Sequence, residues 1–200
     1  MIRAEIIYRY GLFGVALAGA LALFALRPPS GDVDLLLTLI VGALVAAGRS
    51  VNFRISAAGS THMGTPALLA CVLLLQPSVA VPTIALATIL SDGVIRRGPR
   101  GTAFNTGQVI VQAFIVLGFL QLVGWNPADP TFGDPATLVA IFIGGMLAIV
   151  SSALMVSISA SFTQQNGFLT LFWEIMMGGD AKLYLIDLSK ICFGLVNWTC

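Results

Sequence analysis

The sequence ISAAGSTHMGTPALLACVLLLQPSVAVPTIALATILS, at residues 55–91, decides the fold. These 37 residues contain no Asp, Glu, Lys or Arg, and they are followed by Asp92 and by the basic segment IRRGPR at 95–100. A membrane-spanning helix needs about 20 apolar residues, so the stretch is too long for one span and short for two spans with a long loop. We therefore expect two hydrophobic helices that are joined tightly at residues 76–78.

The composition of the whole chain is that of a membrane protein. Of the 200 residues, 58% are hydrophobic and only 10% are charged, whereas soluble domains have roughly a quarter charged residues. Ten basic and nine acidic side chains leave almost no net charge, which argues against a nucleic-acid partner because such proteins carry a basic surface. The length suits one compact bundle and leaves no room for a soluble catalytic domain. We expect a single integral membrane domain over residues 1–200.

Seven hydrophobic segments predict an all-α, polytopic transmembrane bundle of six or seven helices. The expected helices cover residues 10–26, 35–48, 66–75, 79–95, 103–123, 136–162 and 182–200. Alternation of apolar and polar residues at 51–55 predicts a brief extended segment. The apolar patch at 168–177 is too short to span a membrane, which favours an interfacial position. Because the last apolar segment ends without a polar tail, we expect the gene to continue beyond Cys200.

The basic residues gather on one side of this arrangement. If the N-terminus is cytoplasmic, the basic residues that lie inside are Arg3, Arg9, Arg49, Arg54, Arg96, Arg97, Arg100 and Lys182. Arg27 alone then lies outside, together with the acidic loops at 32–34 and 129–134. Cytoplasmic loops of membrane proteins carry an excess of Lys and Arg. The charges therefore predict a multi-pass membrane protein with a cytoplasmic N-terminus, and we expect its location to be the bacterial inner membrane.

One helix face just after the arginines is polar. Asn105, Gln108 and Gln112 recur at i, i+3 and i+7, and polar side chains at membrane depth usually face the bundle interior because exposure to lipid is costly. They could line a ligand pocket or a polar relay that has Asp92, Arg96 and Arg97 at its cytoplasmic mouth. They could instead form interhelical hydrogen bonds, each worth about 0.6 kcal/mol. Asp92 and Arg96 also have the i, i+4 spacing of a helical ion pair.

His62 is the only histidine and the only candidate metal ligand in the sequence. It lies in a polar segment, where a solvated loop histidine is the expected state, so we expect no metal site. The sequence contains no Gly-rich phosphate loop, metal-ligand cluster or catalytic dyad. We therefore expect no enzymatic activity within these residues, and the pattern specifies no cofactor.

Residues 53–112 carry a recognisable order of features. A leucine-rich helix ends before a proline, an alanine-rich helix ends in Asp and arginines, and the motif FN..Q follows. The positions concerned are Pro77, Asp92, Arg96, Arg97, Phe104, Asn105 and Gln108. This order resembles the multi-helix membrane regions found ahead of diguanylate cyclase, cyclic-di-GMP phosphodiesterase and histidine kinase modules in bacteria. The wider architecture is also similar to the substrate-binding subunits of energy-coupling-factor vitamin transporters. The first resemblance implies a sensor region with a signalling output domain as partner, and the second implies a polar-lined interior.

Together, these patterns predict a non-catalytic membrane bundle that is sensor-like or binds a small ligand. The candidate ligand-binding residues are Asp92, Arg96, Asn105, Gln108 and Gln112. The alternative is a structural accessory subunit of a larger photosynthetic or respiratory membrane complex. A ligand-binding bundle would hide the polar face in a cavity, whereas a scaffold subunit would present apolar faces to neighbouring chains. The expected partners are the lipid bilayer, and either other membrane subunits or an output domain.

The predicted topology can be tested by cysteine labelling in intact cells. After replacement of the native cysteines, single cysteines at Pro99 and at Asp129 should differ in their reaction with an impermeant thiol reagent. We expect modification at 129 and none at 99, because the arginine-rich side should be cytoplasmic. Modification at 99 but not at 129 would contradict the topology.

Overall fold

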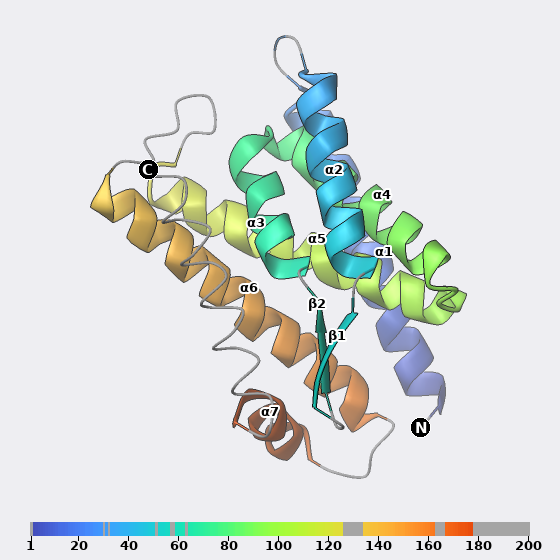
Figure 1. The fold of residues 1–200 in the computed structure, drawn as a ribbon. Coiled ribbons are helices and arrows are strands. Elements are labelled where there is room, and N and C mark those ends of the chain that lie inside the picture. The colour runs from blue at the N-terminus through green and yellow to red at the C-terminus, as the bar shows by residue number, and fades with distance from the viewer. Residues whose placement is uncertain are drawn as a thin grey trace.

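The computed structural model describes residues 2–29, 31, 33–50, 52–56, 59–62, 64–125, 134–162 and 167–177. In this part of the chain the elements are α1 (Ile2–Leu26), α2 (Leu35–Ser50), β1 (Asn52–Ser56), β2 (Gly59–His62), α3 (Gly64–Leu74), α4 (Pro77–Val94), α5 (Pro99–Leu122), α6 (Pro135–Ser161) and α7 (Phe168–Met177) (Figure 1). The prediction of an all-α bundle is confirmed. The two strands form a small antiparallel hairpin at the site of the predicted extended segment.

Four helices, α1, α4, α5 and α6, are long and apolar enough to cross a membrane. The apolar helices α2 and α3 are shorter; the 16 residues of α2 rise about 24 Å, less than the roughly 30 Å of a bilayer core. Large apolar side chains such as Leu26, Leu36 and Leu122 are mostly exposed on the outside of the bundle, which suits contact with lipid tails. The composition and the helices together identify a membrane protein.

The helix boundaries differ from the predicted ones for local reasons. α1 begins at Ile2 and not at residue 10, because Glu5 and Arg9 form an ion pair of 2.6 Å one turn apart and so remain helical. α4 and α5 begin earlier than predicted, at Pro77 and Pro99, and proline suits the first turn of a helix because its missing N–H needs no partner there. The helix predicted at 182–200 lies outside the described residues.

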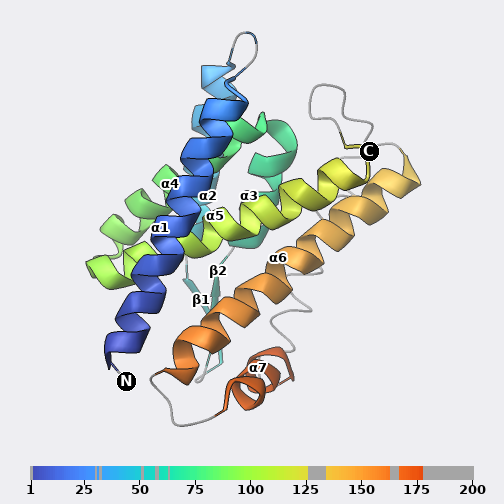
Figure 2. The same cartoon turned by 180° about the vertical axis from the view of Figure 1, so that it is seen from behind.

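α5 is the central helix of the bundle. In its most apolar stretch 72% of the residues are buried, compared with 6% for α1. It packs against α1, α3, α4 and α6, and Figure 2 shows it running behind α1 and beside α6. Ile110 and Val116 are completely buried on it, and Leu120 is nearly so. Asn105, Gln108 and Gln112 on α5 therefore lie in the bundle interior, as the sequence predicted for this polar face.

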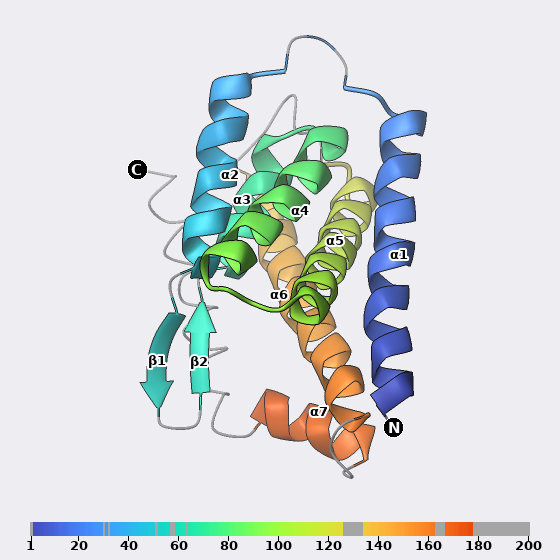
Figure 3. The same cartoon turned by 90° about the vertical axis from the view of Figure 1, so that its right-hand side faces the viewer.

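The two ends of the bundle carry different groups. The α1–α2 and α3–α4 connections lie at one end, and the N-terminus, the hairpin and α7 lie at the other (Figure 3). Asp34 and Asp134 cap the starts of α2 and α6, where their carboxylates accept backbone hydrogen bonds of 2.9 Å and 3.3 Å; a negative charge at a helix start also suits the helix dipole. At the opposite end of α2, Ser50 bonds to Ser91 of α4 at 3.1 Å, which holds the ends of the two helices together.

The close approach of α1 and α5 depends on Gly107. A Cβ atom at this position would lie 2.9 Å from backbone atoms of Phe13, whereas a Cβ at Gly118 of the same helix would meet nothing within 4 Å. Gly107→Ala should therefore lower the stability of the chain in detergent by about 1–3 kcal/mol, since a backbone cannot rotate away from the clash. Gly118→Ala is the matched control and should be neutral or stabilising by up to about 1 kcal/mol. Equal melting temperatures for the two variants would contradict this packing.

Candidate functional site

A small polar cavity lies against the polar face of α5. Its volume is about 70 Å³, room for roughly two water molecules at about 30 Å³ each. The polar residues that line it are Arg49, Thr65, Asp92, Arg97, Asn105, Gln108, Gln112 and Ser152. Apolar side chains of α2, α3, α4 and α5 close the rest of the wall. The cavity is therefore built from five helices, α2 to α6, that converge at one point.

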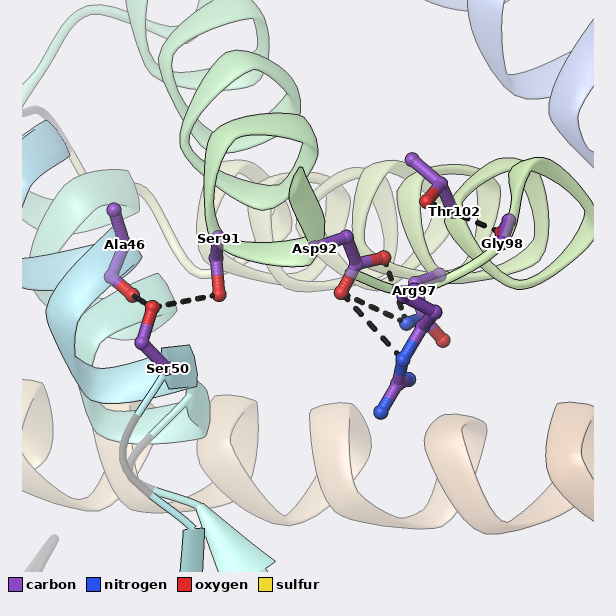
Figure 4. A network of polar contacts seen from close by, with 8 residues as sticks. Ala46, Ser50, Ser91, Asp92, Arg97, Gly98 and Thr102 are labelled. Carbon is purple, nitrogen blue, oxygen red and sulfur yellow. Dashed lines mark hydrogen bonds and ion pairs between the residues drawn. The ribbon is translucent and has the colours of Figure 1, made fainter. Parts of the chain in front are cut away.

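The cavity brings together four of the five predicted ligand-binding residues, and Arg96 is the exception. Arg96 follows the end of α4 at Val94 and adopts a left-handed backbone conformation with φ 54°, so it leaves the helical path. The predicted ion pair between Asp92 and Arg96 is therefore wrong. Asp92 pairs with Arg97, whose Nε lies 3.8 Å from the carboxylate (Figure 4), because the left-handed residue turns the following side chain back toward α4.

Asp92 is 2% exposed and is held by groups of the protein itself. The Nδ2 of Asn105 donates to both carboxylate oxygens, at 2.9 Å and 3.3 Å. The backbone N–H of Arg97 also donates to the Asp92 carbonyl at 2.8 Å. A buried carboxylate is stable only when its charge is paired and its oxygens are hydrogen-bonded. The charge of Asp92 is therefore compensated without any ligand.

The two glutamines of the polar face differ in their partners. Gln108 donates from Nε2 to the hydroxyl of Ser152 at 2.7 Å and also approaches the Ser152 carbonyl at 3.4 Å, so it ties α5 to α6. Gln112, one turn further along α5, is only 7% exposed, and its amide has no hydrogen bond within the described chain. Interhelical bonding thus accounts for Asn105 and Gln108, but it does not account for Gln112.

Sequence reasoning missed Arg49 as a site residue. Arg49 lies in the last turn of α2 and borders the cavity. Its Nε is buried and has no hydrogen-bond partner among the described residues, and the nearby charges that act on it are those of Asp92 and Arg97. A basic residue at the end of an apolar segment is usually expected to extend its charged group into water at the membrane surface. Its turn toward the interior depends on how α2 packs on α4, which the spacing of the sequence does not encode.

Two other candidates do not contribute to this site. His62 is the last residue of β2, and its side chain lies outside the description. Among the described residues no group of three His, Cys, Asp or Glu side chains could hold a metal ion. Cys71 is completely buried and its thiol donates to the Ala80 carbonyl at 3.7 Å, so it acts as a packing residue between α3 and α4.

Comparison of the chain with protein-family models, curated proteins and solved structures found no match. The resemblance to bacterial sensor regions and to vitamin-transporter subunits therefore stays a prediction. The function has to be argued from the cavity and from the residues that surround it.

The different partners of the two glutamines can be tested by substitution with leucine. Gln108→Leu should lower the free energy of unfolding by about 0.6 kcal/mol, because Ser152 loses an interhelical bond. Gln112→Leu should leave stability unchanged or raise it, because no hydrogen bond to another described residue is lost and an apolar side chain is added to the interior. Thermal unfolding of both variants in one detergent would measure the difference. An equal loss for both would show that Gln112 also holds the bundle together.

Proposed function

We propose that this chain is a non-catalytic, sensor-like membrane bundle that binds a small ligand in the cavity beside α5. The observation that supports the proposal is a contrast between the polar groups around the cavity. Asn105 and Gln108 are bonded to protein groups, whereas Gln112 and the Nε of Arg49 border the same space without partners in the described structure. Buried polar groups without partners are rare and need an explanation, and a ligand that supplies the missing partners is one.

The size of the cavity supports a ligand of very few atoms. Pockets that hold drug-sized molecules measure roughly 300–1,000 Å³, and this cavity measures about 70 Å³. A vitamin would not fit without a large rearrangement of the helices. The cavity therefore favours a small ion or solute, and it favours the sensor-like interpretation over a vitamin-transporter subunit.

The position of the cavity also suits a sensor with a cytoplasmic ligand. Arg97 lines it, and the side chain of Arg97 is 44% exposed, so this residue separates the cavity from solvent. With the N-terminus in the cytoplasm of a bacterial cell, as proposed from the charges, the arginine-rich side is the cytoplasmic side. A ligand would enter there, and an output module or a second membrane subunit would receive the response.

One observation favours the alternative of a structural accessory subunit. α1 is largely exposed, with Val15 and Leu21 more than 60% accessible, and so apolar a face suits a neighbouring membrane chain as well as lipid. A scaffold subunit, however, has no use for an unpartnered amide at Gln112. Co-purification of native partners that is lost when Val15 is changed to Trp, with ligand binding unaffected, would support this second function.

Ligand binding can be tested with a thermal-shift screen of the purified chain in detergent. The panel should contain small inorganic anions, inorganic cations and small neutral solutes, because a ligand at 100 times its Kd stabilises a protein by about 2.7 kcal/mol. At least one solute should raise the melting temperature of the wild type in a saturable way. Gln112→Leu should abolish the shift, because it removes the amide that faces the cavity.

The matched control is Gln121→Leu, which changes an exposed glutamine of the same helix far from the cavity. This variant should respond like the wild type. The proposal fails if no solute shifts the wild type, or if the shift persists in Gln112→Leu.

A further inference from the structure

We propose that the ligand of this cavity is a small monovalent anion of about the size of a halide ion. The inference rests on the proposed function and names the chemical class of the ligand. It is carried by the charges around the cavity, by the groups that remain free to bond, by the position of a helix start and by the available volume.

The charges that border the cavity are unbalanced. Arg49 and Arg97 contribute two guanidinium groups, and Asp92 contributes one carboxylate. Asp92 is paired with Arg97 and bonded to Asn105, so one carboxylate is shared between two guanidinium groups. Arg49 forms no ion pair in the described structure. One positive charge therefore remains beside a partly enclosed cavity, where an unpaired charge is costly. An anion would relieve this cost, and a cation would increase it.

The free hydrogen-bonding groups match the same chemistry. Nε–H of Arg49 can only donate, and the amide of Gln112 can turn its NH₂ group toward an anion. A cation would instead need oxygen ligands. Both carboxylate oxygens of Asp92 already accept hydrogen bonds from Asn105. The amides of the lining also carry oxygen acceptors, so the choice of an anion over a cation rests on the guanidinium of Arg49, which can only donate and repels a cation.

The start of α3 adds a third favourable element. α3 begins at Gly64, and both Gly64 and Thr65 line the cavity. The N-terminal end of an α-helix carries a partial positive charge and attracts anions. The eleven-residue α3 therefore contributes a positive potential beside Arg49, independently of any side chain.

The volume limits the size of the anion. A halide ion occupies about the space of one water molecule, roughly 30 Å³, so a cavity of about 70 Å³ has room for such an ion together with water. An organic anion with a long carbon skeleton does not fit. Gluconate is therefore a suitable inert anion for a background salt.

The inference can be tested by titration of sodium chloride, and in parallel sodium bromide, into the purified chain in non-ionic detergent. Sodium gluconate should keep the sodium concentration and the ionic strength constant. The wild type should show a saturable rise in melting temperature of about 3–6 °C at ten times Kd. Arg49→Gln and Gln112→Leu should both lose this rise. Arg100→Gln, which removes an exposed arginine that does not line the cavity, should keep it.

A second variant tests the inference from the opposite direction. Gln112→Glu places a carboxylate of nearly the same shape in the cavity, where it can take the place of the anion beside Arg49. This variant should melt at a higher temperature than the wild type in chloride-free gluconate, and it should no longer respond to chloride. It also keeps the inference testable if Arg49→Gln fails to fold.

The possible outcomes separate this inference from the proposed function. If neither halide shifts the wild type, but a cation or a neutral solute gives a shift that depends on Gln112, the anion inference is overturned and the proposed function stands. If the halide shift persists in both Arg49→Gln and Gln112→Leu, it is a general salt effect and the inference is overturned. If no solute of any class shifts the wild type, the cavity holds water only and both proposals fall.

Discussion

A carboxylate buried at the end of a membrane helix has to be neutralised by groups of the protein, and this bundle depends on that requirement at Asp92. Asn105 donates to both oxygens of the carboxylate and so joins the end of α4 to the second turn of α5. Arg97 completes the arrangement through its backbone and its side chain. The short connection between α4 and α5 is fixed as a result, and α5 is held in the centre of the bundle. The cavity exists because these contacts bring Asp92 and α5 together beside the ends of α2 and α3.

The polar face of α5 combines the two roles that were expected from its spacing: it forms interhelical hydrogen bonds and it lines a cavity. Asn105, at the start of this face, donates a hydrogen bond to Asp92 of α4. One turn later, Gln108 donates to Ser152 of α6. These bonds are structural, and they set the width of the space between the helices. Gln112 extends the same face but finds no protein partner in the described chain. A face made only for helix association would have satisfied or replaced this amide, since an apolar side chain packs there without loss.

The lengths of the apolar segments predicted the bundle, and periodicity predicted the polar face, because each of these signals lies within single segments of the sequence. The spacing of Asn105, Gln108 and Gln112 was sufficient to place them inside. The positions of Arg96 and Arg49 were not predicted, because they do not follow from the spacing of residues within one segment. The predicted end of α4 at residue 95 was nearly right, but Arg96 itself adopts a left-handed conformation, and the i, i+4 spacing does not show that the chain turns there. The inward position of Arg49 depends on the packing of α2 against α4, which is fixed in part by the bond between Ser50 and Ser91. Neither the turn at Arg96 nor the inward position of Arg49 can be derived from the apolar and polar pattern of one segment.

Because the cavity lies against α6, a bound ligand would act on other helices of the bundle through α6. Ser152, which accepts from Gln108, lies on the same helical stripe as Met155 and Ser159. The Met155 carbonyl accepts from the hydroxyl of Tyr8 at 3.3 Å, and Ser159 accepts from Arg9 at 3.2 Å. One side of α6 therefore faces the cavity at one level and holds α1 one to two turns further on. If a ligand of the proposed kind changes the spacing of α5 and α6, α6 has to move against α1 or carry α1 with it. α7, which packs on α6, lies at the same end as the N-terminus (Figure 3), so the displacement would reach the end of the bundle that is cytoplasmic in the proposed topology.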